Sequence, residues 1–292
     1  MDISFLSLSS GSSGNCYYLG CDDYGILIDA GLGLKTIKKL LEENGIEIDS
    51  IKAVLITHDH SDHIKSAGIL AGCCGMAVYA TEAVHNSLAR SKFSLRHIRD
   101  DLRVTVEKEE TFSIGCFYIT PFEVPHDSTD NVGYHIEIGL HNFVYVTDIG
   151  HVTPAICKYV ALANHLIVEA NYDEAMLAGG PYPTFLKARV ASPTGHLSNR
   201  ETACLLATHF HAGLKDIWLC HLSHDNNEAG VAYETVRSHL AGIGVIAGKD
   251  VGLTVLERHA PSGIYDFDSL EEPTTICPAA IPASPTGTDE GI

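Results

Sequence analysis

Four side chains of the metal-binding type lie within the six residues 58–63, directly after a short apolar run. The polar run is Thr57-His58-Asp59-His60-Ser61-Asp62-His63, and it follows Ala53-Val54-Leu55-Ile56. His58 and His60 alternate, so both can bind one cation where the strand ends, while Asp62 and His63 lie further along and can face a second cation. A surface-exposed polar loop is the alternative, but it gives no reason for these donors after an apolar strand. The run predicts a metal site at a strand end.

Three separated donors follow apolar runs in the same way. They are His126 after Phe-Glu-Val-Pro, Asp148 after Phe-Val-Tyr-Val-Thr, and His221 after Ile-Trp-Leu-Cys. Residues at strand ends gather at one rim of a sheet, so positions far apart in sequence become neighbours in space. Taken alone, His126 or His221 is more often an ordinary polar residue. Together with residues 58–63, they predict a site for two metal ions.

Short β-rich runs alternate with helical patterns along the chain. The predicted strands are residues 3–8, 16–20, 25–28, 53–57, 117–123, 132–138, 143–147, 166–168, 217–220 and 252–257. Helices are predicted from Leu34 to a stop at Gly45, and from a capping box at Ser198 and Glu201 to about Ala212. No Pro-, Ser- or Gly-rich linker divides the chain before residue 260. We therefore predict one α/β (α+β) domain over residues 1–258 and an acidic, Pro/Thr-rich tail over 259–292.

The composition bounds the function. Thirty-seven acidic against 19 basic residues leave a net charge of −18, which opposes any coating of nucleic acid or anionic lipid by bulk attraction. The 17 histidines point to metal or acid/base chemistry. The nine cysteines are odd in number and lack C-x-x-C spacing, which is typical of reduced core residues. With no signal peptide and no apolar run of membrane-spanning length, we expect a cytoplasmic protein without membrane association.

At this point the sequence resembles the metallo-β-lactamase superfamily, whose H-x-H-x-D-H motif residues 58–63 match. The resemblance covers about residues 1–258 and implies a four-layer αββα sandwich. It implies that Asp148 bridges two metals, and that Asp29, in Leu-Ile-Asp-Ala-Gly, supports the site without binding metal. The implied ligands of one metal are His58, His60 and His126, and those of the other are Asp62, His63 and His221.

Further residues narrow the branch. Position 148 is Asp, whereas secreted zinc β-lactamases have Cys at the equivalent position, which argues against antibiotic hydrolysis. Glu169 and His196 resemble the extra Glu/His pair of the nuclease branches, such as transfer-RNA 3′-processing enzymes. The Ser-Gly-Ser-Ser-Gly-Asn at 10–15 and the His-Leu-Ser-Asn at 196–199 are similar to the bacterial YycJ/WalJ-type branch, which is associated with 5′ to 3′ exonuclease activity on DNA.

Phosphodiester hydrolysis suits this chemistry without the resemblance. Two cations roughly 3.5–4 Å apart can generate a bridging hydroxide that attacks phosphorus, and they clamp the attacking and leaving oxygens. They do not supply a proton for the departing oxygen. A histidine oriented by a carboxylate can, and we assign that role to His196 with Glu169 as its partner. Simple packing of His196 beside the helix is the alternative. Asp62 is the third residue predicted to be catalytic.

Candidate substrate-binding residues surround these positions. The glycine-rich loop offers Ser12, Ser13 and Asn15, although a plain hairpin turn is equally compatible. Between Glu174 and Glu201 there is no acidic residue, and Lys187 and Arg189 can track a phosphate backbone. Ser198 and Asn199 complete the predicted substrate-binding set. A second basic run, Arg90 to Arg103, fits a solvated helix face better.

The sequence thus predicts a dinuclear metal-dependent nuclease, with zinc as the first choice and manganese or iron as alternatives. The predicted substrate is DNA ahead of RNA, and the oligomeric state is left open. The alternatives are an RNA-processing nuclease or a hydrolase of a cyclic phosphodiester, lactone or thioester. A di-iron redox protein is a further class, since the same fold hosts such centres.

Overall fold

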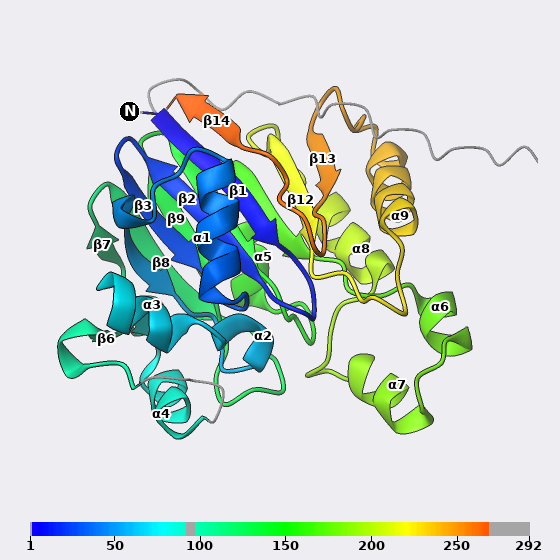
Figure 1. Cartoon of the computed structure of the whole chain (residues 1–292). Helices are drawn as coiled ribbons and strands as arrows, with labels where there is room; N and C mark the ends of the chain where they lie inside the picture. Colours follow the sequence, from blue (N-terminus) through cyan, green and yellow to red (C-terminus); the bar gives the residue numbers. More distant parts are fainter. Residues whose placement is uncertain (1, 92–96, 269–292) are drawn as a thin grey trace, which may run out of the picture.

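The computed structural model of the chain describes residues 2–91 and 97–268, which form two seven-stranded mixed sheets and the helices that cover them (Figure 1). The first sheet runs in the order β14 (Tyr265–Asp268), β1 (Asp2–Ser9), β2 (Cys16–Cys21), β3 (Tyr24–Ile28), β4 (Ile51–Leu55), β5 (Ala77–Ala80) and β6 (Arg103–Thr105). The second runs β13 (Gly252–Val255), β12 (Asp216–Cys220), β11 (His165–Glu169), β10 (His141–Val146), β9 (Val132–Ile138), β8 (Phe117–Glu123) and β7 (Phe112–Ile114).

The α-helices are α1 (Leu34–Glu43), α2 (Ser61–Ile64), α3 (Ala67–Cys74), α4 (Glu82–Arg90), α5 (Pro154–Val160), α6 (Glu174–Gly179), α7 (Thr184–Val190), α8 (Asn199–His209) and α9 (Ala229–Gly242). Two short 3₁₀ helices span Ile48–Ser50 and Asp100–Leu102. Within the described ranges, no helix is both long and apolar enough to cross a membrane.

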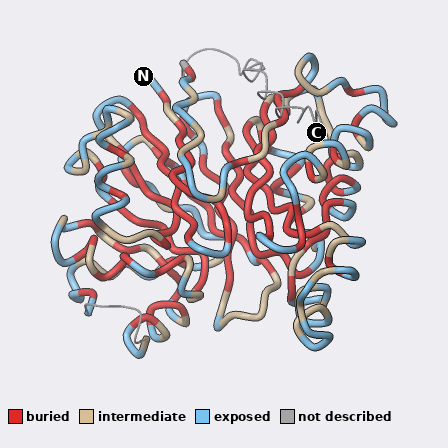
Figure 2. The backbone as a smooth tube through the Cα atoms, turned by 45° about the vertical axis from the view of Figure 1, so that its right-hand side comes forward, coloured by how far each residue is buried: buried red, intermediate tan, exposed pale blue. Residues whose placement is uncertain are grey.

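Alternating residues of the strands form separate layers of the core. In β1, Ile3 and Phe5 pack between the two sheets with Trp218 of the second sheet, whereas Leu6 and Leu8 pack on the other face. That outer face of the first sheet carries α1, α3 and α4, and the outer face of the second carries α5, α8 and α9. Figure 2 shows the buried residues concentrated along the sheets. The predicted four-layer αββα sandwich is confirmed.

Strand direction explains where a site can form. β3, β4, β5 and β6 run parallel to one another, as do β10, β11, β12 and β13, so the carboxyl ends of each group meet at one edge of their sheet. β8 points the same way as β10, because each is antiparallel to β9. The residues that follow these strands, or end them, therefore converge at one rim.

The predicted strands match observed ones closely, and four observed strands were not predicted. These are β5, β6, β7 and β14, each of three or four residues. The capping box of α8 is present as predicted, but the helix ends at His209 rather than near Ala212. β14 lies beyond residue 258, in the predicted tail, and pairs antiparallel with β1, so the first sheet continues past that boundary. Residues 269–292 lie outside the described residues.

Candidate metal centre

The candidate ligands come together at the rim where the two sheets present their carboxyl ends. His58 follows β4, His126 follows β8, Asp148 follows β10, and His221 follows β12. α2 begins at Ser61 and carries Asp62 and His63 in its first turn. One donor atom from each member of several overlapping trios lies within 4.8 Å of its partners, so the residues form a continuous cluster.

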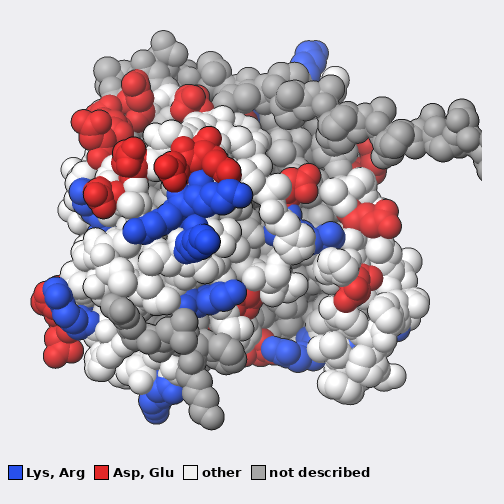
Figure 3. All heavy atoms as spheres, in the orientation of Figure 1, with Lys and Arg blue, Asp and Glu red and all other residues white. Residues whose placement is uncertain are grey.

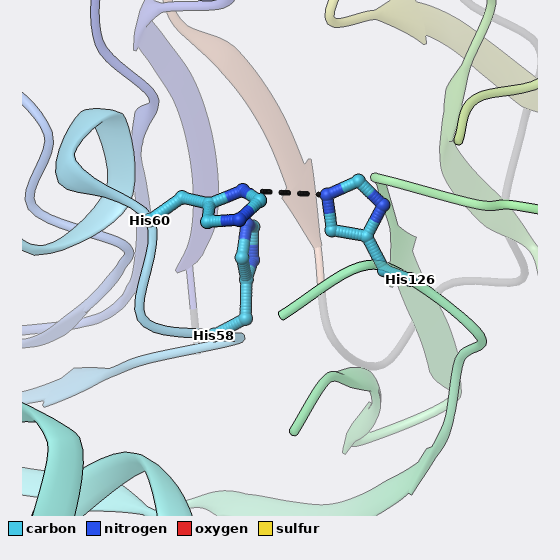
Figure 4. A group of neighbouring side chains, drawn as sticks. All are labelled: His58, His60 and His126. Carbon is cyan, nitrogen blue, oxygen red and sulfur yellow. Dashed lines mark hydrogen bonds between the residues drawn. The ribbon is translucent and has the colours of Figure 1, made fainter. Parts of the chain in front are cut away.

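The first group is His58, His60 and His126 (Figure 4). His126 Nε2 lies 3.3 Å from His60 Nδ1. His126 Nδ1 donates to the Gly195 carbonyl at 3.0 Å, and His58 Nδ1 lies 3.0 Å from the Thr57 hydroxyl. Because the Nδ1 atoms of His58 and His126 contact groups outside the cluster, their Nε2 atoms are the nitrogens that can bind a metal, which is the arrangement expected of imidazole ligands.

The second group is Asp62, His63 and His221. One carboxylate oxygen of Asp62 lies 3.6 Å from His63 Nε2 and 3.7 Å from His221 Nε2. Burial by itself raises the pKa of Asp62, but the neighbouring imidazoles of His63 and His221 lower it well below its usual range. The carboxylate is therefore ionised, as a metal ligand must be.

Asp148 lies between the two groups. Its Oδ1 is 3.5 Å from His126 Nε2 on one side, and its Oδ2 is 3.3 Å from His63 Nε2 on the other. The residue is buried and has a φ of 53°, in the left-handed region that few non-glycine residues adopt. A strained backbone held at this point aims a carboxylate at both groups, which is the position of a bridging ligand.

Two orphaned nitrogen atoms show that the cluster fits metal ions. His58 Nε2 and His221 Nε2 are buried and have no hydrogen-bond partner among the described residues. An unpaired buried polar atom costs about 1–3 kcal/mol, so such atoms in a native fold call for an explanation. One orphan belongs to each group of donors. Two divalent cations, one per group, would satisfy both atoms.

Asp29 supports the cluster through hydrogen bonds. It follows β3 with a φ of 60°, is fully buried, and accepts a 2.7 Å hydrogen bond from His63 Nδ1. The backbone N–H and hydroxyl of Thr57 donate to the same carboxylate at 2.9 and 3.1 Å. Carboxylates in this position fix the tautomer and orientation of a ligating imidazole. Although burial opposes the charge on His63, the carboxylates led by Asp29 raise its pKa to about 9.

Gly31 allows the loop after β3 to approach the segment of residues 58–63 closely. A Cβ at this position would lie 1.7 Å from the carbonyl oxygen of Asp62, so only glycine fits. The Asn15 N–H donates to that Asp62 oxygen, and the Gly31 N–H donates to the Asn15 carbonyl, each at 2.8 Å. Three segments distant in sequence are thereby joined behind the second group.

Glu169 joins His196 to the metal centre. It ends β11, is fully buried, and its Oε1 lies 2.9 Å from Nδ1 of both His196 and His221. Its Oε2 accepts from the N–H groups of Ile149 at 2.9 Å and Leu197 at 3.1 Å. Burial raises the pKa of Glu169, but His196, His221 and these hydrogen bonds lower it overall. The ionised carboxylate orients both imidazoles.

A cleft of about 290 Å³ opens onto this cluster. Its lining residues are Ser12, His60, Ser61, Asp62, Asp148, Arg189, His196 and His221. Ser12 and Arg189 are thus the two predicted substrate-binding residues that line it. Arg189 is held by an ion pair, with its Nε 2.5 Å from Asp127 Oδ2. Lys187 instead donates to the Ala178 carbonyl, and Ser13 bonds to His259.

Three of the predicted substrate-binding residues are buried and make hydrogen bonds within the protein. Asn15 is buried, bonds to both backbone groups of Gly11 and lies 3.0 Å from His63 Nε2. Ser198 is the buried N-cap of α8, and Asn199 is buried against Asn227. Each of these side chains is used by the fold, and its contact with substrate stays a prediction.

Asp59 and Asp127 were not selected from the sequence. Asp59 accepts hydrogen bonds from the hydroxyls of Ser87 and Thr129 and from the Thr129 N–H. These bonds connect residues 58–63, here called the ligand run, to α4 and to the loop after His126. Asp127 lies 3.4 Å from His126 Nε2. Their positions next to the candidate ligands His58, His60 and His126 in the sequence were an available signal.

The second basic run carries ion pairs rather than a free cationic face. Arg99 pairs with Asp101 and Arg103 with Glu82, at 2.7 and 2.8 Å. Lys92 and Arg96 lie outside the described residues. The structure therefore agrees with a solvated face for the part that it describes.

Comparison with known proteins places the chain in a family. Residues 24–221 match the model of the β-lactamase superfamily domain. The exodeoxyribonuclease WalJ of Streptococcus pneumoniae serotype 2 (strain D39 / NCTC 7466) is 37% identical over 242 residues, covering 82% of this chain and 90% of that protein. The exodeoxyribonuclease YycJ of Bacillus anthracis is 33% identical over 247 residues, covering 84% and 92%.

Solved structures agree on the fold. The metallo-β-lactamase fold protein YhfI from Bacillus subtilis superposes with a TM-score of 0.67 at 16% identity, covering 91% of this chain and 100% of that chain. The family match spans the ligand run, Asp148 and His221, and both named exodeoxyribonucleases align over most of their length. The chain belongs to the β-lactamase superfamily.

Proposed function

We propose that this protein is a dinuclear metal-dependent phosphodiesterase that acts as a 5′ to 3′ exonuclease on DNA. The observation that carries the proposal is the Glu169 carboxylate, which holds His196 at the cleft and His221 in the second ligand group with the same oxygen atom. A proton donor and a candidate metal ligand are thereby fixed relative to each other.

The donor set fits two divalent cations. His58, His60 and His126 would hold one, Asp62, His63 and His221 would hold the other, and Asp148 would contact both. When bound, such a pair supplies a hydroxide near neutral pH and stabilises charge on phosphoryl oxygens. Imidazole and carboxylate donors favour zinc, and they also accept manganese or iron.

His196 supplies what the cations do not. Its Nδ1 is hydrogen-bonded to Glu169, so Nε2 is the ring nitrogen that can interact with a substrate in the cleft that His196 lines. In the imidazolium form, Nε2–H would donate a proton to the departing oxygen of the nucleotide, and the hydrogen bond to Glu169 would hold the ring in place for that transfer. Arg189 lies in the same cleft and is suited to bind a phosphate oxygen of the substrate.

The proposed substrate, DNA, and the proposed direction of cleavage rest on similarity to the relatives. Two relatives that align over most of this chain are named exodeoxyribonucleases, which favours DNA over RNA as the substrate. The 5′ to 3′ direction follows from resemblance to their branch. The cytoplasmic location remains a prediction from the sequence.

One assay separates this proposal from the alternatives. The metal-loaded protein is incubated with 5′- and 3′-labelled DNA, with labelled RNA, and with a lactone. The expected result is loss of nucleotides from the 5′ end of DNA, with slower cleavage of RNA. Turnover of the lactone alone would identify a small-molecule hydrolase, and efficient cleavage of RNA without DNA would identify an RNA-processing enzyme.

A further inference from the structure

α7 presents an aromatic side chain that the fold does not use. All seven residues of Thr184–Val190 are at least partly exposed, and Phe185 is 74% exposed. In Figure 1, α7 lies beside α6 at the lower right, apart from the helices that cover the sheets. A helix of this length is not stable by itself, and here it buries no apolar face in the described structure. Core packing therefore does not account for Phe185.

The fold fixes α7 to the active-site cleft instead. The His196 N–H donates to the Val190 carbonyl, the last residue of the helix, at 2.9 Å. Arg189 lines the cleft and is paired with Asp127, the neighbour of His126. The carboxyl end of α7 is thus joined to both the proposed proton donor and the first ligand group.

Phe185 lies four residues before Arg189 in this helix, and Arg189 lines the cleft. Residues four apart share a helix face and are separated by about 6 Å along the axis, so Phe185 stands one turn beyond Arg189. The segment from Ala175 to Arg200 contains no acidic residue in a chain of net charge −18. The surface over α7 is correspondingly poor in acidic side chains on the face shown in Figure 3.

We propose that Phe185 is a substrate-binding residue whose ring stacks on an unpaired base of single-stranded DNA entering the cleft. The inference rests on the proposed nuclease function and deepens it. An exposed aromatic ring next to a cation is the arrangement by which proteins bind single strands without reading sequence. A base inside a duplex is covered on both faces, whereas an unpaired base can offer a face to the ring, so the ring favours an unpaired nucleotide next to the cleft.

A second copy of the chain is the competing occupant of this face. Two chains of net charge −18 repel each other, whereas a region without acidic residues beside Arg189 attracts a polyanion. The charge therefore favours the nucleic acid, and the oligomeric state is a readout of the test.

The test compares DNA affinity among three variants of the full chain. The probe is a fluorescein-labelled, phosphorothioate-linked oligothymidylate, and anisotropy gives Kd at fixed salt. Phe185→Ala should weaken binding by roughly 5- to 150-fold, the range for loss of a base-stacking aromatic, and Phe185→Trp should restore it. Tyr118→Ala is the matched control, because Tyr118 is 58% exposed and is the second residue of β8, whose other end leads to His126.

A probe with one abasic site identifies the contact. The abasic site is moved along the oligonucleotide one position at a time. At one position near the 5′ end, wild type and Phe185→Ala should bind equally, because the base that the ring contacts has been removed. Equal Kd values for wild type and Phe185→Ala on the intact probe would overturn the inference. So would a Phe185→Ala variant that changes only from dimer to monomer in light scattering.

The outcomes separate this inference from the proposed function. If metal-loaded wild type degrades DNA and Phe185→Ala has the same Kd and KM, the nuclease stands and the stacking role is wrong. If wild type binds the probe through Phe185 but cleaves no nucleic acid, the nuclease proposal is wrong and the binding role stands. A melting curve of Phe185→Ala confirms that the exposed substitution leaves the fold intact.

Discussion

Single carboxylates do much of the positioning at the residue scale. Glu169 accepts hydrogen bonds from two histidines and two backbone N–H groups, and Asp29 accepts from His63 and from two groups of Thr57. Asp148, Asp29 and His221 all have φ between 53° and 60°. Strained residues of this kind persist where surrounding contacts determine them, and here they coincide with the candidate metal centre.

The role of His196 leads to the first prediction. His196→Ala should lower kcat on DNA by about 10²- to 10⁴-fold, the usual contribution of a general acid, without changing metal content. The same variant should lose far less activity on a phosphodiester with a p-nitrophenolate leaving group, which departs without protonation. Steady-state kinetics on both substrates measure the difference. His151→Ala, an exposed histidine bonded to the Pro193 carbonyl, is the control.

Equal losses on the two substrates would show that His196 only binds or packs. Full DNA cleavage by His196→Ala would remove the proposed mechanism altogether.

Residue identity could be predicted at the site because strand ends carry the signal. The ligand run and Asp148 each follow an apolar strand, so the sequence alone predicted their convergence, and the structure brings them together. Asn15, Ser198 and Asn199 could not be placed the same way. A polar residue in a loop looks the same in sequence whether it faces solvent or satisfies a buried backbone group.

At the scale of elements, the length of a strand determined whether the sequence predicted it. β5, β6 and β7 have three or four residues each, too few for an alternating pattern to emerge. β14 follows a break in the pattern and gains its strand character from pairing with β1. The long strands β8 and β9 were predicted with their observed bounds, since seven residues carry a clear signal.

The contact at Gly31 gives a prediction for the ligand loop. Gly31→Ala should displace the loop that carries Asp62, because the added Cβ would lie 1.7 Å from its carbonyl oxygen. We expect a destabilisation of about 1–3 kcal/mol and loss of roughly one bound metal per chain. Urea denaturation and metal analysis measure the two effects. Gly230→Ala in α9, where nothing lies within 4 Å of the new Cβ, should do neither.

The contact between α4 and β6 gives a pH prediction. His85 is buried and its Nε2 lies 3.0 Å from the Val104 carbonyl; burial lowers its pKa despite that hydrogen bond. The folded protein thus binds fewer protons than the unfolded chain below pH 6.5, so its free energy of unfolding falls as the pH decreases from there. His85→Gln keeps a donor to Val104 but does not titrate.

Denaturation between pH 7 and 5 tests this prediction. The slope of unfolding free energy against pH should be shallower in His85→Gln than in wild type, by up to about 1.4 kcal/mol per pH unit. Parallel slopes for His85→Gln and wild type would contradict the assignment.

At the scale of the whole molecule, charge is distributed unevenly. The chain carries −18, yet Lys and Arg side chains gather over α1 beside acidic ones on the face in Figure 3. The candidate cleft has its own cation in Arg189 and would gain charge from bound metals. Overall charge therefore argues against tight coating of DNA, but it leaves room for local engagement at the cleft.

Salt dependence tests where DNA is engaged. Binding of a single strand should weaken as salt rises, and Arg189→Gln should reduce the slope of log K against log salt by about 0.7, the value for one lost phosphate contact. Lys39→Gln, on the α1 surface, should leave the slope unchanged. The opposite pattern would place the DNA over α1 instead of the cleft.

If two metal ions act together at this centre, DNA cleavage should depend on both of them. Divalent metal is titrated into the chelator-treated protein, and DNA cleavage and bound metal are measured at each point. Exonuclease activity should rise with the second equivalent and saturate at about two ions per chain. Full activity at one ion per chain, or none at two, would show that the two ions do not act together.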